Sequence, residues 1–240
     1  MVSSHFFTTE ALIIGSMRYR EADRIVNLYT RDRGRLGAIA KGVRRLKSKT
    51  GGRLEPFSLV RASFHSGRGS LYTVTGVETL RTFQGVRDKL FRMEEGARLF
   101  SAVRKLFPEE EASVEAFNLL VRGVAQLAET ADAAAAANVV LATRLKLLTL
   151  LGYAPETKRC SFCEAEGPFP GYSPAQGGVV CQGCWAGETG EAFALSGGAL
   201  ATLQVLMDKP LAELEGLDID ERAAAEVEQV LTQTLAYHGH

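Results

Sequence analysis

Four cysteines constrain this chain more than any other feature of the sequence. Cys160 and Cys163 form one Cys-x2-Cys pair, and Cys181 and Cys184 form a second pair after seventeen intervening residues. Each pair can place two thiolates on one tight turn, and two such turns can close a tetrahedral four-sulfur site, which favours zinc. Four thiolates fill every coordination position, so the expected zinc is structural and not catalytic. The alternative is a set of four free cysteines, or a site that has lost its metal.

The segment around the cysteines is rich in glycine and proline, from residue 153 to about residue 195. This composition suits knuckles and hairpin turns, and it does not suit a core that folds unaided. We therefore predict a small inserted module that depends on its metal.

Two further patterns bear on the compartment. No run of eighteen apolar residues occurs, and the segment MVSSHFFTTE lacks a basic stretch followed by an apolar one. These patterns predict neither a membrane span nor a signal peptide. We expect the reducing cytoplasm, where cysteines bind metal more often than they pair as disulfides.

Short alternating runs in the first eighty residues predict β-strands. Val60, Ala62 and Phe64 alternate with polar residues, as on a strand with one buried face. Turn signals such as Asp32-Arg33-Gly34 and Thr50-Gly51-Gly52 separate the runs. About five short strands with closely spaced turns suit a small barrel, and the OB-fold is the candidate at this size.

Beyond residue 86 the apolar pattern becomes helical. Helical spacing relates five apolar residues, namely Leu90, Met93, Ala97, Phe100 and Phe107. Pro108 ends this helix, and a second amphipathic helix is expected over residues 112–129. The segment from residue 133 to Gly152 is apolar nearly all round, which predicts the buried centre of a helical bundle. Two more helices are expected, from about Gly198 to Met207 and from about Glu221 to Tyr237.

Together these patterns predict an α+β protein with three parts. An OB-fold β-barrel that binds nucleic acid occupies residues 1–82. An α-helical domain follows over residues 83–152 and 191–240, and it carries a four-cysteine zinc ribbon at residues 153–190.

A basic segment, KGVRRLKSKTGGR at residues 41–53, has six basic side chains and no acidic one, although the whole chain balances 28 against 28. Residues 1–90 carry 17 Lys and Arg against 7 Asp and Glu, so the surplus lies in the predicted barrel. Phosphate backbone is the usual partner of such a segment, and oligonucleotides lie beside strands 2 and 3 of OB barrels. The alternative is a solvated loop without a partner. We expect phosphate contacts from nine residues: Arg31, Arg33, Arg35, Lys41, Arg44, Arg45, Lys47, Lys49 and Arg53.

Aromatic residues near these strands are candidates for stacking on bases, although aromatics in short barrels more often fill the interior. The candidates are Tyr19, Tyr29, Phe57 and Tyr72.

No catalytic motif of a hydrolase, metalloprotease, kinase or dinucleotide-binding enzyme occurs, so we assign no catalytic residue. The three acids Glu109–Glu111 are expected to be a solvated helix start. The sequence favours a binding protein over an enzyme.

Longer stretches resemble a known family. ALIIGSMRYREADRIVNLYTRDRGRLGAIAKGVRRLKSKTGGRLEPFSLV (residues 11–60) resembles the N-terminal domain of the RecO family of bacterial recombination mediators. LLTLLGYAPETKRCSFC (residues 147–163) and GGVVCQGC (residues 177–184) resemble that family's junction and zinc module, in the same order and spacing. One departure is that many members have Arg-Phe where this chain has Ala142-Thr143, which puts in doubt any interaction assigned to that pair.

The resemblance implies a function in DNA repair and recombination after DNA damage. Members of the family bind single- and double-stranded DNA and anneal complementary strands. They act with RecR and the single-stranded-DNA-binding protein to load RecA onto single strands, so a cytoplasmic, nucleoid-associated protein without a membrane partner is expected.

Two functions of other classes stay open on the sequence. One is a zinc-containing nucleic-acid-processing enzyme with an unrecognised active site. The other is a scaffold that uses its basic face to bind an acidic protein.

Overall fold

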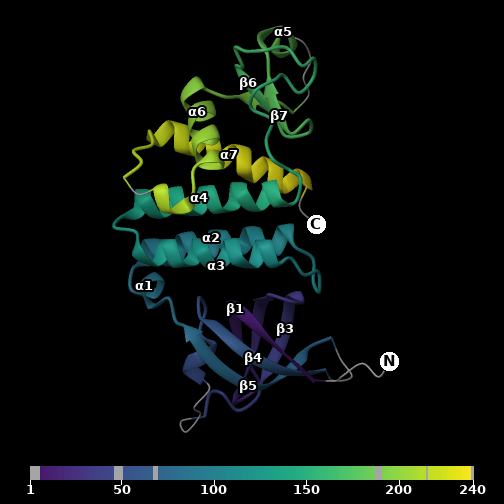
Figure 1. Ribbon diagram of the computed structural model, residues 1–240, viewed down its shortest axis with the longest axis vertical. Helices are drawn as coiled ribbons and strands as arrows, with labels where there is room; N and C mark the ends of the chain where they lie inside the picture. Colours follow the sequence, from purple (N-terminus) through teal and green to yellow (C-terminus); the bar gives the residue numbers. More distant parts are fainter. Residues whose placement is uncertain (1–5, 46–50, 67–69, 187–190, 215, 239–240) are drawn as a thin grey trace. The chain divides into compact units, whose positions relative to one another are not determined.

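A computed structural model describes residues 6–45, 51–66, 70–186, 191–214 and 216–238 (Figure 1). The chain separates into two compact units, Met1–Glu129 and Thr130–His240, and each is described by itself. The predicted boundaries at residues 82, 152 and 190 divide the chain differently, and they stay a prediction.

The first unit begins with a closed barrel of five strands. Its strands are β1 (Phe6–Tyr19), β2 (Asp23–Thr30), β3 (Gly34–Ala40), β4 (Leu59–Ser66) and β5 (Tyr72–Arg81). They follow the order β1-β2-β3-β5-β4, with β4 closing on β1. All neighbouring pairs are antiparallel except β3 and β5, which are parallel. The predicted OB-like barrel is therefore confirmed.

The barrel interior is filled by alternate residues of its strands, as the sequence alternation predicts. Ile13, Leu28 and Phe64 are fully buried and belong to one hydrophobic core. The short 3-10 helix η1 (Gly51–Leu54) lies between β3 and β4 and adds Leu54 to this core.

Three helices complete the first unit. The positions of the second and third agree with the predicted helices, whereas the short first one was not predicted. They are α1 (Gln84–Arg87), α2 (Leu90–Leu106) and α3 (Val114–Glu129). The acids Glu109–Glu111, however, do not begin a helix, because they lie in the linker between α2 and α3.

The buried face of α2 differs from the expected one. Leu90 and Met93 are 71% and 42% exposed, whereas Gly96 and Val103 are buried. A side chain at Gly96 would place its Cβ 2.4 Å from the Phe57 ring, so the helix packs against the barrel through its glycine. Leu99, Val103 and Leu106 on this face have helical spacing, but the glycine contributes no apolar side chain to the pattern.

Aromatic pairs attach the helices to the barrel. The Tyr29 and Phe107 rings lie 5.4 Å apart, and the Phe57 and Phe100 rings stack at 4.8 Å. Tyr29 and Phe57 are thus buried in packing. Neither offers an exposed ring to a base.

The second unit is built on a buried helix, α4 (Ala133–Leu150). Asp132 caps its start by accepting a hydrogen bond from the Ala135 N–H at 2.8 Å, and Gly152 follows its end with φ of 84°. Helices α6 (Gly197–Asp208) and α7 (Glu221–His238) pack against it, with the 3-10 helix η2 (Leu211–Glu213) between them in the chain. All three long helices were predicted.

Helix α4 is the one described helix that is long and apolar enough to cross a membrane, with a mean hydropathy of 1.4. However, 61% of it is buried in the fold. Because core helices of soluble proteins have the same properties, this helix is weak evidence for a membrane span.

The departure Ala142-Thr143 lies within α4. Both residues are fully buried, and the Thr143 hydroxyl donates to the Val139 carbonyl at 2.7 Å. In this chain the pair serves packing inside the second unit.

Candidate metal centre and nucleic-acid interface

The four cysteines meet at one point of the second unit. Their Sγ atoms lie within 4.8 Å of one another, and the Sγ atoms of Cys163 and Cys181 are 3.6 Å apart. Sulfurs at about 2.3 Å from a tetrahedral zinc are about 3.8 Å apart, whereas a disulfide needs about 2.05 Å. The cluster therefore has the dimensions of a metal site, and the cysteines are unpaired.

A small three-stranded sheet positions the four thiols. Its strands are β6 (Gly171–Ser173), β7 (Gly178–Val180) and β8 (Phe193–Ala194), in the order β7-β6-β8. The first cysteine pair lies in a turn tied to β7, because the Ser161 N–H donates to the Val179 carbonyl at 2.9 Å. The second pair follows β7 directly: Cys181 precedes the short helix α5 (Gln182–Trp185), which contains Cys184.

The thiols differ in how readily they ionise. Burial acts to raise the pKa of Cys160, but the backbone N–H groups of Cys181, Phe162 and Cys163 outweigh it and lower this pKa to about 6. The hydrogen bond that the Cys184 thiol donates to Cys163, together with burial, raises the pKa of Cys184 to about 12. One thiolate therefore forms easily, and a divalent cation is the partner that lets the remaining thiols ionise beside it.

This cysteine module, residues 153–195, is attached to the helices of its own unit. The fully buried Tyr172 lies with its hydroxyl 3.2 Å from the Thr234 hydroxyl on α7. On the side of α6, the Gln204 amide donates to the Thr157 carbonyl at 3.2 Å.

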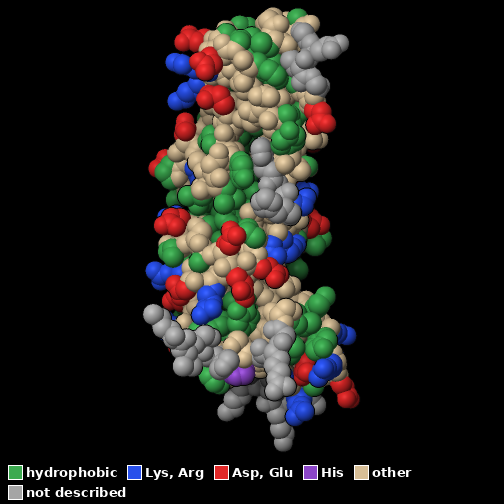
Figure 2. All heavy atoms as spheres, turned by 90° about the vertical axis from the view of Figure 1, so that its right-hand side faces the viewer, with side chains coloured by type: hydrophobic (Ala, Val, Ile, Leu, Met, Phe, Trp, Pro, Cys, Tyr) green, Lys and Arg blue, Asp and Glu red, His purple; other side chains and the backbone are tan. Residues whose placement is uncertain are grey.

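The basic residues of the barrel need a residue-by-residue account. On the face drawn in Figure 2, basic and acidic side chains are interspersed. Local charge therefore depends on which cations have carboxylate partners.

The predicted phosphate contacts fall at two opposite ends of the barrel. Arg31 and Arg33 lie in the turn between β2 and β3, whereas Lys41, Arg44 and Arg45 follow the other end of β3. The seven residues of β3 span about 23 Å between these ends. Lys47 and Lys49 lie outside the described residues.

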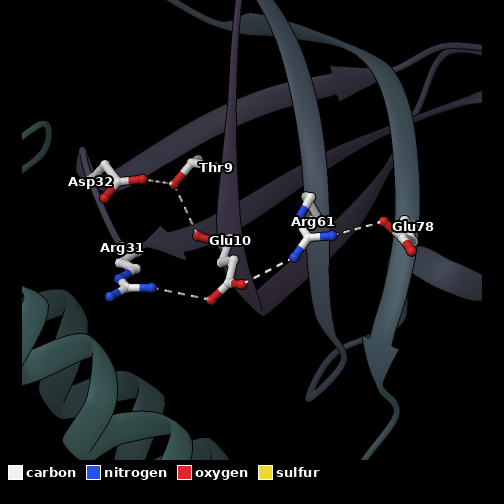
Figure 3. A network of polar contacts seen from close by, with 6 residues as sticks. All are labelled: Thr9, Glu10, Arg31, Asp32, Arg61 and Glu78. Carbon is white, nitrogen blue, oxygen red and sulfur yellow. Dashed lines mark hydrogen bonds and ion pairs between the residues drawn. The ribbon is translucent and has the colours of Figure 1, made fainter.

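At the β2–β3 end, Arg31 belongs to a chain of ion pairs across the barrel surface (Figure 3). Glu10 lies 3.8 Å from Arg31 and 3.5 Å from Arg61, and Arg61 lies 3.2 Å from Glu78. The charge of Arg31 is thus shared with carboxylates of neighbouring strands.

Arg35 lies near the start of β3, at the same end of the barrel. Its side chain points into the unit and is only 19% exposed. Its guanidinium donates to the carbonyls of Phe107, at 2.8 Å, and Arg104, and it lies 3.6 Å from the Glu109 carboxylate. These carbonyls form the C-terminal end of α2, which favours a cation. Arg35 thus caps the C-terminal end of α2, and a phosphate contact by this residue stays a prediction.

At the opposite end, the start of the basic segment is tied to the β1–β2 turn. The Arg44 N–H donates to the Ala22 carbonyl at 3.0 Å, and its guanidinium donates to the Glu21 carbonyl at 2.9 Å. The Gly42 N–H donates to the Asp23 carboxylate at 2.8 Å.

Lys41, Arg44 and Arg45 are exposed, and no ion pair of theirs occurs within the described ranges. Arg53 is also exposed and donates to the Val77 carbonyl at 2.8 Å.

The structure adds two cations that sequence reasoning missed. Arg18 and Arg20 flank the β1–β2 turn beside the basic segment, and both are exposed. The Arg20 guanidinium lies 5.1 Å from the centre of the Tyr19 ring. Their nearness to Arg44 depends on the register of β1 and β2, which an isolated charge in a sequence does not indicate.

An apolar strip lies on the outer face of the same strands. Met17 is opposite Ile25, which is opposite Ile39, so the three side chains share one face. Met17 is 58% exposed, and the two isoleucines are partly exposed. Alternation could have found Ile25 and Ile39, which have the opposite parity to the core residues of their strands. Met17 has the same parity as the core residues Ala11 and Ile13, and a β-bulge between Ile13 and Gly15 turns it to the outer face.

Two comparisons with known proteins agree with this architecture. Residues 3–83 match the family model described as "Recombination protein O N terminal", and residues 90–239 match "Recombination protein O C terminal". The "DNA repair protein RecO" of Rubrobacter xylanophilus is 37% identical over 212 residues, which cover 86% of this chain and 83% of that protein. The protein of the same name from Pelotomaculum thermopropionicum is 33% identical over 234 residues, or 97% and 89% of the two chains. That from a Nocardioides species is 39% identical over 183 residues, or 74% of each chain.

Proposed function

The chain belongs to the RecO family of DNA repair proteins, which is not a family of enzymes, and from this premise we propose that it is a recombination mediator. In this role it binds single- and double-stranded DNA and anneals complementary strands. With RecR it helps to load RecA onto single strands coated by the single-stranded-DNA-binding protein.

One observation carries the DNA-binding part of the proposal. Five exposed cations without a carboxylate partner in the described structure meet at one end of the barrel, from the β1–β2 turn and the basic segment. These residues, Arg18, Arg20, Lys41, Arg44 and Arg45, adjoin the strip of Met17, Ile25 and Ile39. Cations suit the phosphates and an exposed apolar strip suits the bases of a single strand.

Annealing requires no bond chemistry. Two polyanions must be brought together, their repulsion must be screened, and their bases must stay free to pair. Contacts to phosphate satisfy this requirement, because they position a strand without reading its sequence. The strands themselves then supply the specificity.

The test is annealing of two complementary oligonucleotides without nucleotide, with product lengths checked for cleavage. We expect the Lys41→Ala/Arg44→Ala/Arg45→Ala variant to anneal slowly and to bind single strands weakly. A matched control, Arg98→Ala/Lys105→Ala/Arg122→Ala, removes three cations from α2 and α3 and should behave as wild type.

Salt dependence gives the same test in numbers. If about six phosphates are contacted, log affinity falls against log salt with a slope of about −4. We expect the slope of the Lys41→Ala/Arg44→Ala/Arg45→Ala variant, the barrel variant, to be about half of that value. Normal binding by that variant, or a slope near zero in the wild type, would contradict the DNA-binding assignment.

We also propose that Cys160, Cys163, Cys181 and Cys184 hold a structural zinc. The sulfur spacing and the four-thiol donor set support zinc over harder metals. The ion would act as a cross-link between the two cysteine pairs.

The second unit is the proposed surface for protein partners such as RecR. Residues 130–240 carry 6 Lys and Arg against 14 Asp and Glu, the reverse of the barrel. An acidic surface lets a partner dock without competing for DNA. Co-elution with purified RecR in size-exclusion chromatography tests it, and loss of the complex at high salt is expected. A nucleoid-associated, cytoplasmic location follows from the proposed role.

A further inference from the structure

The linker between α2 and α3 binds to the barrel through its three acids. We call Glu109, Glu110 and Glu111 the acidic strap. The Glu110 N–H donates to the Arg35 carbonyl at 2.9 Å, and Arg35 and Glu109 form a parallel β-bridge. Gly34 has φ of 63°, and a Cβ there would lie 2.0 Å from the Glu111 carbonyl oxygen. The strap therefore lies directly against the start of β3.

The acidic strap occupies the part of the barrel where two strands do not pair. β3 pairs with β5 only through Ala38 and Ile39, so its first half has no β5 partner. The Glu110 carboxylate accepts a hydrogen bond from the hydroxyl of Tyr72, the first residue of β5, at 2.5 Å. This hydrogen bond raises the pKa of Tyr72, which keeps the phenol a donor. The strap thus connects β3 with β5.

Its carboxylates lie among the cations of the β2–β3 end. A cavity of about 480 Å³ there is lined by Phe7, Thr8, Thr9, Asp32, Arg33 and Glu110. Arg33 lies over the Phe7 ring at 4.1 Å, and Asp32 accepts a hydrogen bond from the Thr9 hydroxyl at 2.7 Å. Two carboxylates and one guanidinium give this cavity a net negative charge, which repels phosphate.

The two ends of the barrel therefore differ in charge although both are rich in arginine. At the β2–β3 end, Arg31 faces Glu10 and Arg35 faces Glu109. At the β1–β2 end, the Asp23 carboxylate is bound to the Gly42 N–H, and Lys41, Arg44 and Arg45 form no ion pair among the residues that the structure describes.

We propose that the acidic strap excludes phosphate from the β2–β3 end and so determines where DNA lies on the barrel. The inference rests on the proposed DNA binding and adds a specificity determinant to it. It assigns Glu109 and Glu110 a role in positioning DNA without touching it, since Glu109 pairs with Arg35, Glu110 lines the same cavity as Arg33, and both add negative charge beside the cations of this end.

The test is the Glu109→Gln/Glu110→Gln variant, compared with Glu94→Gln/Glu129→Gln. The control removes the same charge from the same unit, at the opposite ends of α2 and α3. The probe is a labelled oligothymidylate of about 16 nucleotides, and fluorescence anisotropy is measured over a range of salt.

We expect the strap variant to bind about fivefold more tightly than wild type at low salt. Its salt slope should steepen by about 0.7 for each additional phosphate that the protein neutralises, while the control changes neither quantity. Glutamine keeps an amide oxygen that can accept from Tyr72, so the strap should stay docked. Glu109→Gln alone, at a side chain that is 71% exposed, should give a smaller change in the same direction.

Adding Arg31→Ala/Arg33→Ala identifies the cations involved. In the strap variant these changes should abolish the increase in affinity, whereas in wild type they should have little effect. Unchanged affinity and slope in the strap variant, or an increase that survives loss of both arginines, would overturn the inference. Failure of the proposed function looks different, because wild type would then not bind the probe or would bind equally well without Lys41, Arg44 and Arg45.

Discussion

The β-barrel and the cysteine module are both built on short, mostly antiparallel strands, but they bury very different amounts of side chain. The barrel has strands of 7 to 14 residues around a continuous core that includes Ile13, Leu28 and Phe64. The module has strands of two or three residues, and its largest buried side chain, Tyr172, reaches Thr234 on α7. Burial of apolar area can hold the first region together, whereas the second needs a cross-link.

The sharpest test of this contrast is removal of the metal. Structural zinc contributes an apparent binding free energy of about 10–16 kcal/mol, so its loss should unfold the cysteine module and leave the barrel folded. Trp185 is the only tryptophan in the sequence and lies in α5, so its emission reports on the module. We expect chelation, or Cys181→Ser, to shift this emission to longer wavelength with little loss of far-UV circular dichroism.

The control for metal removal is Ser161→Ala, in the same turn as the first cysteine pair, which should keep one zinc per chain by elemental analysis. An emission spectrum that chelation leaves unchanged would show that the module has a sufficient core of its own.

Within the barrel, a core truncation should act on the free energy of unfolding of the first unit. Phe64 is fully buried and its ring lies 5.1 Å from the Phe7 ring. Phe64→Ala should cost about 3–5 kcal/mol, measured by urea denaturation followed by circular dichroism. Phe6→Ala, at a side chain that is 61% exposed, should cost less than about 1 kcal/mol. Equal effects would mean that the barrel does not depend on its interior.

Replacing a glycine by alanine would create a similar steric clash in the first unit, at Gly96, and in the cysteine module, at Gly171. A Cβ at Gly96 would lie 2.4 Å from the Phe57 ring, and one at Gly171 would lie 2.3 Å from the Trp185 ring. Overpacking costs about 1–3 kcal/mol, which exceeds the stabilisation of about 0.5–1 kcal/mol from replacing a helical glycine at residue 96.

We expect Gly96→Ala to lower the unfolding midpoint of the first unit without affecting tryptophan emission. Gly171→Ala should change the emission of Trp185 and leave that midpoint unchanged. A change of both observables by either variant would contradict the independence of the two regions.

The smallest expected effect concerns the helix that follows the module. Ser196 caps α6 by accepting a hydrogen bond from the Ala199 N–H at 3.1 Å. Ser196→Ala should lower the free energy of unfolding of the second unit by about 1 kcal/mol, whereas Ser196→Asp should keep the cap. Zinc content should be the same in both variants, and metal loss from Ser196→Ala would show that the module depends on α6 as well as on its thiols.

Several features could be predicted from sequence because their signals are local. The barrel strands follow from alternation such as Val60, Ala62 and Phe64, and the cysteine cluster follows from two closely spaced pairs. The extents of α2 and α4 follow from helical spacing and from the positions of Pro108 and Gly152. Leu99, Val103 and Leu106 have the spacing of the observed buried face of α2, but the close approach of the Phe57 ring to Gly96 could not be predicted.

The candidate DNA site was predicted only in part. The basic segment indicated a cationic surface on the barrel, yet Arg18 and Arg20 join it only through the pairing of β1 with β2. The acids of the strap were expected to form a solvated helix start. Their side chains are exposed, but their backbone binds β3, which nothing near them in sequence indicates.

Residue types and their spacing were enough to show which side chains can carry the chemistry: four thiols at the spacing of a metal site, and a barrel with a large surplus of cations. Which of those cations lack a carboxylate partner depended on the fold. Arg31 and Arg35 look the same in sequence as Lys41 and Arg44, but the fold brings Glu10 and Glu109 to the first two. Charge is fixed by residue type, whereas its neutralisation depends on distances of a few ångströms between residues that can be more than seventy positions apart, as Arg35 and Glu109 are.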